Sequence, residues 1–343
     1  MAHRLGRSTI QLERCPVILS SAAVGSKMEG EGPLGQRFDY ISPDSTFGEE
    51  SWEKAEGKMQ QLALQTALSK GGFDPEEIDF LFAGDLLNQC VSSSYGLRDF
   101  SIPFLGLYGA CSTMAEGLLT ASLFVECGLA QRAAAVTSSH FCSAERQFRF
   151  PLEYGGQRPP SSQWTATAAG AAIVGTGKGI AVRTVTAGVI QDLGITDANN
   201  MGAAMAPAAA STLLTFFRDT STGPGCYDLI LTGDLGQVGR DLLFQLLEQE
   251  GVSISQQHRD CGLLLYDQQT QDVHSGASGC GCSASVLCGA ILQDMAEGRY
   301  QNVLFMATGA LMSPTMVQQG ESIPGVAHLV HLSTQKPGKG ESV

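Results

Sequence analysis

IDFLFAGDLL at residues 78–87 recurs in altered form as YDLILTGDLG at residues 227–236. Both stretches contain an acidic residue, a short apolar run and then Gly-Asp-Leu, and 149 residues separate Asp85 from Asp234. The segments before them, residues 51–72 and 200–221, align at the same offset. Each of these has small or apolar residues at three-to-four spacing, which is typical of a helix. The chain therefore contains a repeated unit of helix, loop and buried strand.

A second pair of segments supports the repeat. GACSTMA (109–115) and GCGCSASV (279–286) each precede a helix-like run and then a strand, and 26 residues separate both Cys111 from Thr137 and Cys282 from Thr308. Buried strands such as LILTG occur in any α/β chain, but chance similarity does not explain both spacings. We predict two homologous halves, residues 1–176 and 177–343, that meet at the glycine-rich stretch IVGTGKGIAVR.

Alternating strands and helices in each half predict parallel sheets covered by helices. The run at 114–127 is apolar and lacks a polar face, so we expect this helix to lie between two sheets. The predicted fold is therefore α/β, with five layers in the order αβαβα built from the two duplicated halves.

The composition excludes some classes of partner. The net charge is −13 and no basic stripe is present, so nucleic acid is not an expected ligand. No apolar run approaches the ~20 residues that span a bilayer, and the first residues lack the apolar core of a signal peptide, so we expect synthesis in the cytoplasm. The ten cysteines form no CxxC pair, and GTGKG (175–179) lacks the spacing of a phosphate loop. We expect neither a metal nor a cofactor.

A cysteine that follows Gly-Ala at the start of a buried helix, in a duplicated α/β chain, resembles the thiolase and ketoacyl-synthase superfamily. Longer strings resemble one family in it, stage V sporulation protein AD, over residues 10–331. These strings are GPLG (32–35), LFAGDLLNQ (81–89), IPFLGLYGACST (102–113), SSHFCSAERQFRFPLEYGGQ (138–157), DLGITD (192–197), MGAAMAPAAA (201–210), DLILTGDLG (228–236) and ATGALMSPTMVQQG (307–320).

This resemblance implies a thiolase-like fold and a role in the machinery that takes dipicolinic acid into the developing endospore. It also implies direct binding of dipicolinate, alone or as its calcium chelate. The implied partners are the membrane proteins of the stage V sporulation A operon, which would hold the chain at the spore inner membrane. Thiolase-like chains usually form homodimers through the sheet edge before the cysteine segment, here residues 102–109.

Cys111 occupies the position of the superfamily's nucleophile, but two partners that the synthases require are replaced. Gly233 takes the place of a histidine after the strand of the second half, and Cys280 takes the place of an asparagine or histidine. Neither residue can supply the donors that stabilise a developing oxyanion. We therefore expect a non-catalytic binding protein. The alternatives are an acyltransferase that uses Cys111 on an acyl thioester, and a dimeric scaffold with a vestigial pocket.

A flat ring with two carboxylates requires a slot with an apolar wall and with arginine or N–H donors. Residues 140–157 offer two arginines among aromatic residues, directly after a predicted strand. The predicted ligand-binding residues are Cys111, His140, Arg146, Arg149 and Asp234. Each has a structural alternative: a small buried side chain that fills the interface between the halves for Cys111, a hydrogen bond to its loop for His140, a surface ion pair for Arg146, a subunit interface for Arg149, and a helix cap or a contact across the pseudo-twofold axis for Asp234.

Overall fold

The computed structural model describes residues 2–148 and 158–334. Ten strands follow one another in the order β12-β11-β14-β15-β10-β3-β9-β7-β5-β6. This row consists of two sets of five, which are joined where β10 pairs antiparallel with β3. The first set comprises β3 (Val17–Gly25), β5 (Phe80–Gly84), β6 (Phe104–Gly106), β7 (Arg132–Ser139) and β9 (Ala168–Gly175). The second set comprises β10 (Ile180–Thr186), β11 (Leu229–Thr232), β12 (His258–Asp260), β14 (Asn302–Ala310) and β15 (Gly325–Ser333).

The two sets have the same internal order, so the duplication expected from the sequence is present in the topology. Helices α2 (Trp52–Gly71) and α6 (Met201–Thr220) occupy equivalent places and begin and end at the offset of the sequence repeat. Individual hydrogen bonds are also repeated between the two halves. Asp79 accepts hydrogen bonds from the main-chain N–H groups of residues 131 and 132, and Asp228 accepts them from residues 301 and 302.

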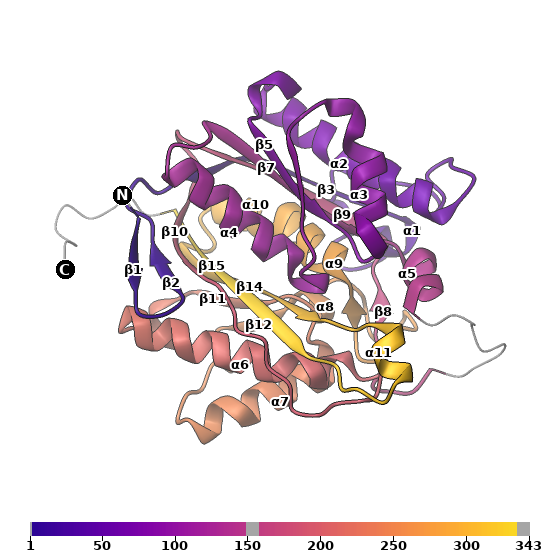
Figure 1. Cartoon of the computed structure of the whole chain (residues 1–343), viewed down its shortest axis with the longest axis vertical. Coiled ribbons are helices and arrows are strands. Elements are labelled where there is room, and N and C mark those ends of the chain that lie inside the picture. Colours follow the sequence, from indigo (N-terminus) through magenta and orange to yellow (C-terminus); the bar gives the residue numbers. More distant parts are fainter. Residues whose placement is uncertain (1, 149–157, 335–343) are drawn as a thin grey trace.

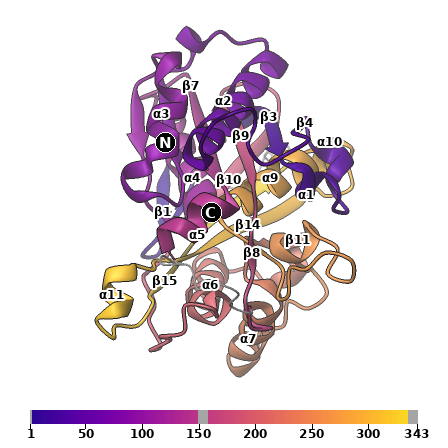
Figure 2. The same ribbon diagram turned by 90° about the vertical axis from the view of Figure 1, so that its right-hand side faces the viewer.

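Five layers result, as Figures 1 and 2 show. Helices α2 and α3 (Val91–Leu97) cover the first sheet, and α6 and α7 (Gly236–Gln249) cover the second. Between the sheets lie α4 (Thr113–Glu126) and the helical segment α9 (Cys280–Val286) and α10 (Leu292–Ala296). Because α4 and α9 contact both sheets, they need apolar side chains on most of their surface. The predicted five-layered thiolase-like arrangement is confirmed.

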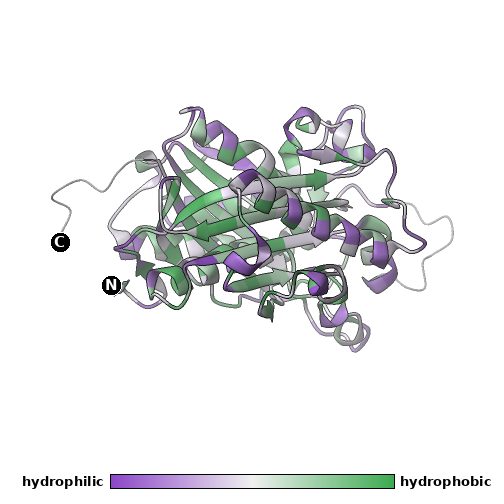
Figure 3. Cartoon of the chain, turned by 90° about the horizontal axis from the view of Figure 1, so that it is seen from above, coloured by the Kyte–Doolittle hydropathy of each residue, from purple (hydrophilic) through white to green (hydrophobic). Residues whose placement is uncertain are grey.

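Small residues allow the middle layer to approach the sheets closely. Strand β9 consists largely of buried alanine and glycine, and β7 contains buried alanine, serine and threonine. A Cβ atom at Gly170 would lie 2.5 Å from the carbonyl oxygen of Ala284 in α9, so glycine is required there. The hydropathy colours of Figure 3 show the same division, with apolar strands inside and polar helix faces outside.

The remaining elements are short: β1 (His3–Leu5), β2 (Thr9–Gln11), α1 (Lys27–Gly30), β4 (Tyr40–Ile41), α5 (Phe141–Phe148), β8 (Trp164–Thr165), α8 (Cys261–Leu264), β13 (Ala277–Ser278) and α11 (Pro314–Gln318). Strand β8 pairs with β13 in a separate small sheet. Within residues 2–148 and 158–334, no helix is long and apolar enough to cross a bilayer.

Candidate functional site

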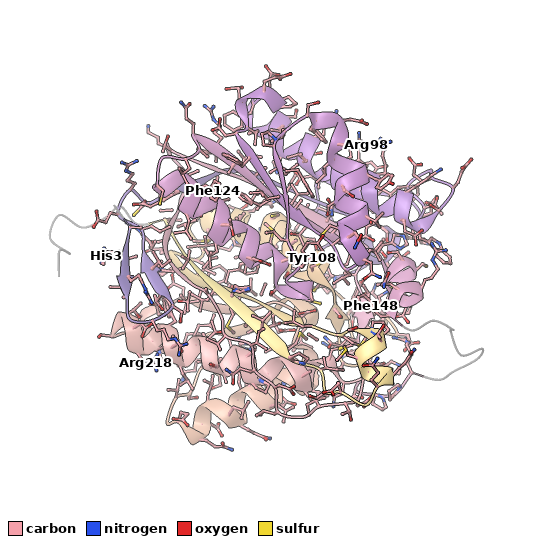
Figure 4. All side chains as sticks on the ribbon, viewed as in Figure 1. His3, Arg98, Tyr108, Phe124, Phe148 and Arg218 are labelled. Atoms are coloured by element: carbon pink, nitrogen blue, oxygen red, sulfur yellow. The ribbon has the colours of Figure 1, made fainter. Side chains whose placement is uncertain are left out.

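A cavity of about 420 Å³ opens where strands of both sheets end. Its volume lies within the usual range for small-ligand pockets. The lining residues are Asp85, Leu86, Leu87, Asn88, Gln89, Tyr108, Ala110, Cys111, Ala144, Glu145, Phe148, Gln163, Thr165, Asn199, Met201, Ser278, Ala310, Leu311 and Met312. Figure 4 labels Tyr108 and Phe148, which belong to the wall on the side of the first half. The wall combines apolar side chains with amide and hydroxyl groups and with the carboxyl groups of Asp85 and Glu145.

Cys111 lies in the cavity wall just before α4 and is only 8% exposed. The residue before it, Ala110, has a φ of 48°, a left-handed conformation that is strained for a residue with a Cβ atom. Burial raises the pKa of the Cys111 thiol well above its usual value, and the carboxyl group of Asp234 raises it further. The thiol therefore stays protonated at neutral pH, which is unfavourable for a nucleophile.

Asp234 is fully buried, and its carboxyl group interacts with the thiol of Cys111. One carboxyl oxygen accepts from the N–H of Gly279 at 2.8 Å, and the other accepts from the hydroxyl of Thr308 at 3.1 Å. Burial raises the pKa of Asp234 to about 7. The structure brings Asp234 together with Cys111, and its carboxyl group reaches across to α9 and β14. The N–H groups at the start of α7 are instead bound by Asp260.

Gly233 and Cys280, which were expected to replace the synthases' catalytic partners, lie close to β14 and to β7 respectively. A Cβ atom at Gly233 would lie 3.0 Å from the Cα of Ala307 and from the backbone nitrogen of Thr308, so a larger side chain requires a shift of β14. Cys280 points away from the cavity wall, because its thiol donates to the carbonyl of Ser138 at 2.9 Å. Among the described lining residues there is no histidine.

Gln163 lines the cavity and was not predicted from the sequence. Its amide nitrogen donates to the carbonyl oxygens of Asp234 and Ala277, both at 2.7 Å, which fixes the orientation of the amide. The amide oxygen is buried and has no hydrogen-bond donor within the described part of the chain. A buried acceptor without a donor is costly, so this oxygen marks a place where a ligand or water can donate. A lone glutamine in a loop gives no sequence signal for such a role.

Asp85, the first-half counterpart of Asp234, also lines the cavity. Its carboxyl group accepts from the N–H of Leu87 and from the N–H and hydroxyl of Ser93, each at 2.7–2.8 Å. Desolvation raises the pKa of Asp85. Its turn is strained as well, since Gln89 and Cys90 both have positive φ angles. Strain of this kind at a cavity is a frequent property of functional sites.

His140 and Arg146, which were also predicted, are not among the residues that line this cavity. His140 is buried and bonds through Nε2 to the carbonyl of Ser45 at 2.8 Å, so it holds a neighbouring loop. Arg146 pairs with Glu53 and lies over the ring of Trp52. It lines a smaller adjoining cavity of about 240 Å³. Arg149 lies outside the described residues. Within those residues, no group of three or more metal-binding side chains is present.

Comparisons with known proteins agree on the fold. The chain is similar to 3-oxoacyl-[acyl-carrier-protein] synthase III from Aquifex aeolicus, with a TM-score of 0.57 and 12% identity, over 93% of this chain and 99% of that one. It is also similar to cerulenin-bound OleA from Xanthomonas campestris, with a TM-score of 0.59 and 10% identity, over 94% and 99% of the two chains. At these identities the likeness concerns the fold alone.

Two sequence comparisons identify the family. The family model of stage V sporulation protein AD (SpoVAD) matches residues 6–333. Stage V sporulation protein AD of Bacillus subtilis (strain 168) is 46% identical over 326 residues, which cover 94% of this chain and 96% of that protein. The chain therefore belongs to the stage V sporulation protein AD family, with the thiolase-like fold.

Proposed function

We propose that the chain binds dipicolinate reversibly in the cavity beside Cys111 and catalyses no reaction on it. The observation that carries this proposal is the cavity wall, which joins apolar surface to amide and hydroxyl groups, with a thiol that is held protonated and with the carboxyl groups of Asp85 and Glu145. Membership of the family gives the ligand class, because the family resemblance implies dipicolinate uptake during sporulation.

The wall suits a flat ring. Phe148, Leu87 and Met312 supply apolar surface, and the amides of Asn88 and Asn199 supply N–H donors for carboxylates. Such donors orient an anion without a full positive charge. The helix that follows Cys111 adds the partial positive charge of its N-terminus.

Acyl transfer by Cys111 is the alternative. It requires a thiolate and a base that accepts the proton. Asp234 raises the pKa of the thiol, so the geometry favours binding over acyl transfer. Incubation with acyl thioesters followed by intact-mass analysis tests the alternative, and a stable adduct on Cys111 would support it.

The remaining parts of the proposal concern assembly. We propose that calcium, where it is bound, is held by the carboxylates of the ligand. We propose further that β6 forms a homodimer contact, since Phe104 and Leu105 are exposed on this edge strand. Attachment to the spore inner membrane would occur through the membrane proteins of the same operon.

Titration calorimetry tests the binding proposal. Dipicolinate should bind, whereas picolinate, with one carboxylate, and isophthalate, without the ring nitrogen, should bind more weakly.

Met312→Trp, which fills the cavity, should weaken binding at least about tenfold, or 1.4 kcal/mol. Met316→Trp is the matched control, since Met316 is exposed in α11 and lies outside the wall. Arg149→Ala should cost about 1.5–3 kcal/mol if Arg149 contacts a carboxylate. No heat and no thermal shift with dipicolinate would refute the proposal.

A further inference from the structure

A chain of hydrogen bonds connects Asp85 in the cavity wall to Glu56 in the interior. Asp85 accepts from the hydroxyl of Ser93 at 2.7 Å. The amide nitrogen of Gln60 donates to the hydroxyl oxygens of Ser93 and Ser138, at 2.9 Å and 2.8 Å. The hydroxyl of Ser138 then donates to Glu56 at 2.9 Å. Glu56, Gln60, Ser93 and Ser138 are fully buried, and Asp85 is 4% exposed. We call these five residues the carboxyl network.

No basic side chain bonds to either carboxyl group within the described part of the chain. The second oxygen of Glu56 accepts from the hydroxyl of Ser143. Strands β3 and β9, against which α2 packs, contain no titratable residue, and β7 contains only Arg132, which pairs with Glu77. The titratable groups around the network include Glu53 on α2 itself and, on other elements, Cys90, Tyr95, Tyr108, Cys111, Glu116, His140, Cys142, Glu145, Arg146, Asp234 and Cys280. Arg146 is engaged with Glu53 at the surface.

The carboxyl network also contains one hydrogen-bond acceptor that has no donor among the described residues. The amide oxygen of Gln60 is buried and has no donor among the described residues. Two buried carboxyl groups without a cation cannot both ionise cheaply, because desolvation and mutual repulsion favour retention of a proton. Both effects raise the pKa of Glu56. An anion in the cavity would add negative charge beside Asp85 and would exclude water, and both changes favour protonation of the carboxyl network.

We propose that the cavity takes up its anionic ligand together with a proton, which the carboxyl network holds while the ligand is bound. This inference rests on the proposed function only in that the ligand is an anion. One carboxylate of the network accepts a proton from solvent as the ligand enters and returns this proton to solvent as the ligand leaves. No other bond is made or broken. Affinity should therefore fall as pH rises.

The test is calorimetric titration of the full chain with dipicolinate, in buffers of different ionisation enthalpy, between about pH 6 and pH 8. Both carboxylates of dipicolinate stay ionised in this range, so proton uptake reports on the protein. The expected result is a positive slope of observed enthalpy against buffer ionisation enthalpy, equivalent to a fraction of a proton per ligand. The dissociation constant should rise with pH, by at most about tenfold per pH unit.

Variants assign the proton to the network. Asp85→Asn and Glu56→Gln should each lower the uptake, and Asp234→Asn measures separately the contribution of the carboxyl group beside Cys111. Glu126→Gln is the control, because Glu126 is buried at the far end of α4 and bonds to residues 13 and 14. Binding without proton uptake in the wild type, or uptake that persists unchanged in Asp85→Asn and Glu56→Gln, would overturn the inference alone. No binding in any buffer would refute the proposed function, and with it this inference.

Discussion

The carboxyl group of Asp234, from the second half of the chain, interacts with the thiol of Cys111 from the first half. This contact joins the second-half Gly-Asp-Leu segment to the first-half cysteine segment. A carboxyl group next to a thiol disfavours thiolate, whereas an imidazolium ion would favour it. The pair therefore supports the proposed binding role over acyl transfer by Cys111.

Replacing Asp234 with asparagine should make Cys111 more reactive. Loss of the carboxyl group removes a repulsive charge, so the pKa of the thiol falls and alkylation by iodoacetamide at about pH 8 should be several-fold faster. Peptide mass spectrometry measures this rate. The exposed Cys127 is an internal control and should react equally fast in both proteins. An unchanged rate at Cys111 would argue against the Cys111–Asp234 contact.

Glu56→Gln should change the pH dependence of stability. Burial, followed by repulsion from Asp85, raises the pKa of Glu56 to about 8, above its unfolded value. The stability that protonated Glu56 contributes is fully present below about pH 4.5 and is lost as pH rises towards 8. The glutamine side chain of the variant does not titrate. The free energy of unfolding of the variant minus that of the wild type should therefore rise by up to about 1.4 kcal/mol per pH unit over this range.

Urea unfolding of both proteins between about pH 5 and pH 8 measures this difference. Desolvation lowers the pKa values of His140, His258, His328 and His331, and these histidines titrate in both proteins and cancel in the comparison. A difference that is constant with pH would contradict the assignment to Glu56.

Ala110→Gly should stabilise the chain. A left-handed φ costs alanine more than glycine, and this gain exceeds the extra flexibility that glycine gives the unfolded chain. We expect the free energy of unfolding to rise by about 0.5–1 kcal/mol. Denaturant midpoints measure the change, and a loss of stability would show that Ala110 is not strained.

Leu105→Asp should separate the proposed homodimer. Leu105 lies on the edge strand β6 and is 44% exposed, so an added charge would be buried in a strand-to-strand contact. Light scattering coupled to size exclusion measures the mass. Leu129→Asp is the control, since Leu129 is also exposed but follows α4 outside the strand. A wild-type monomer, or a variant that stays dimeric, would refute the β6 interface.

Local patterns predicted much of the fold. The offset between 51–72 and 200–221 gave the ends of α2 and α6 to within two residues, because their caps, Ser51 and Asn200, are encoded at the same place in each repeat. The site was harder to predict, because long-range contacts decide which side chains reach the cavity. His140 bonds to Ser45, 95 residues away, and Gln163 is held by two carbonyl groups from the second half.

The crystal structure of the chain soaked with dipicolinate tests the central claim most directly. The account predicts planar density in the cavity between Cys111, Phe148 and Met312, with no covalent bond to the sulfur atom. A cavity that stays empty at saturating dipicolinate, or density that appears elsewhere on the molecule, would contradict it.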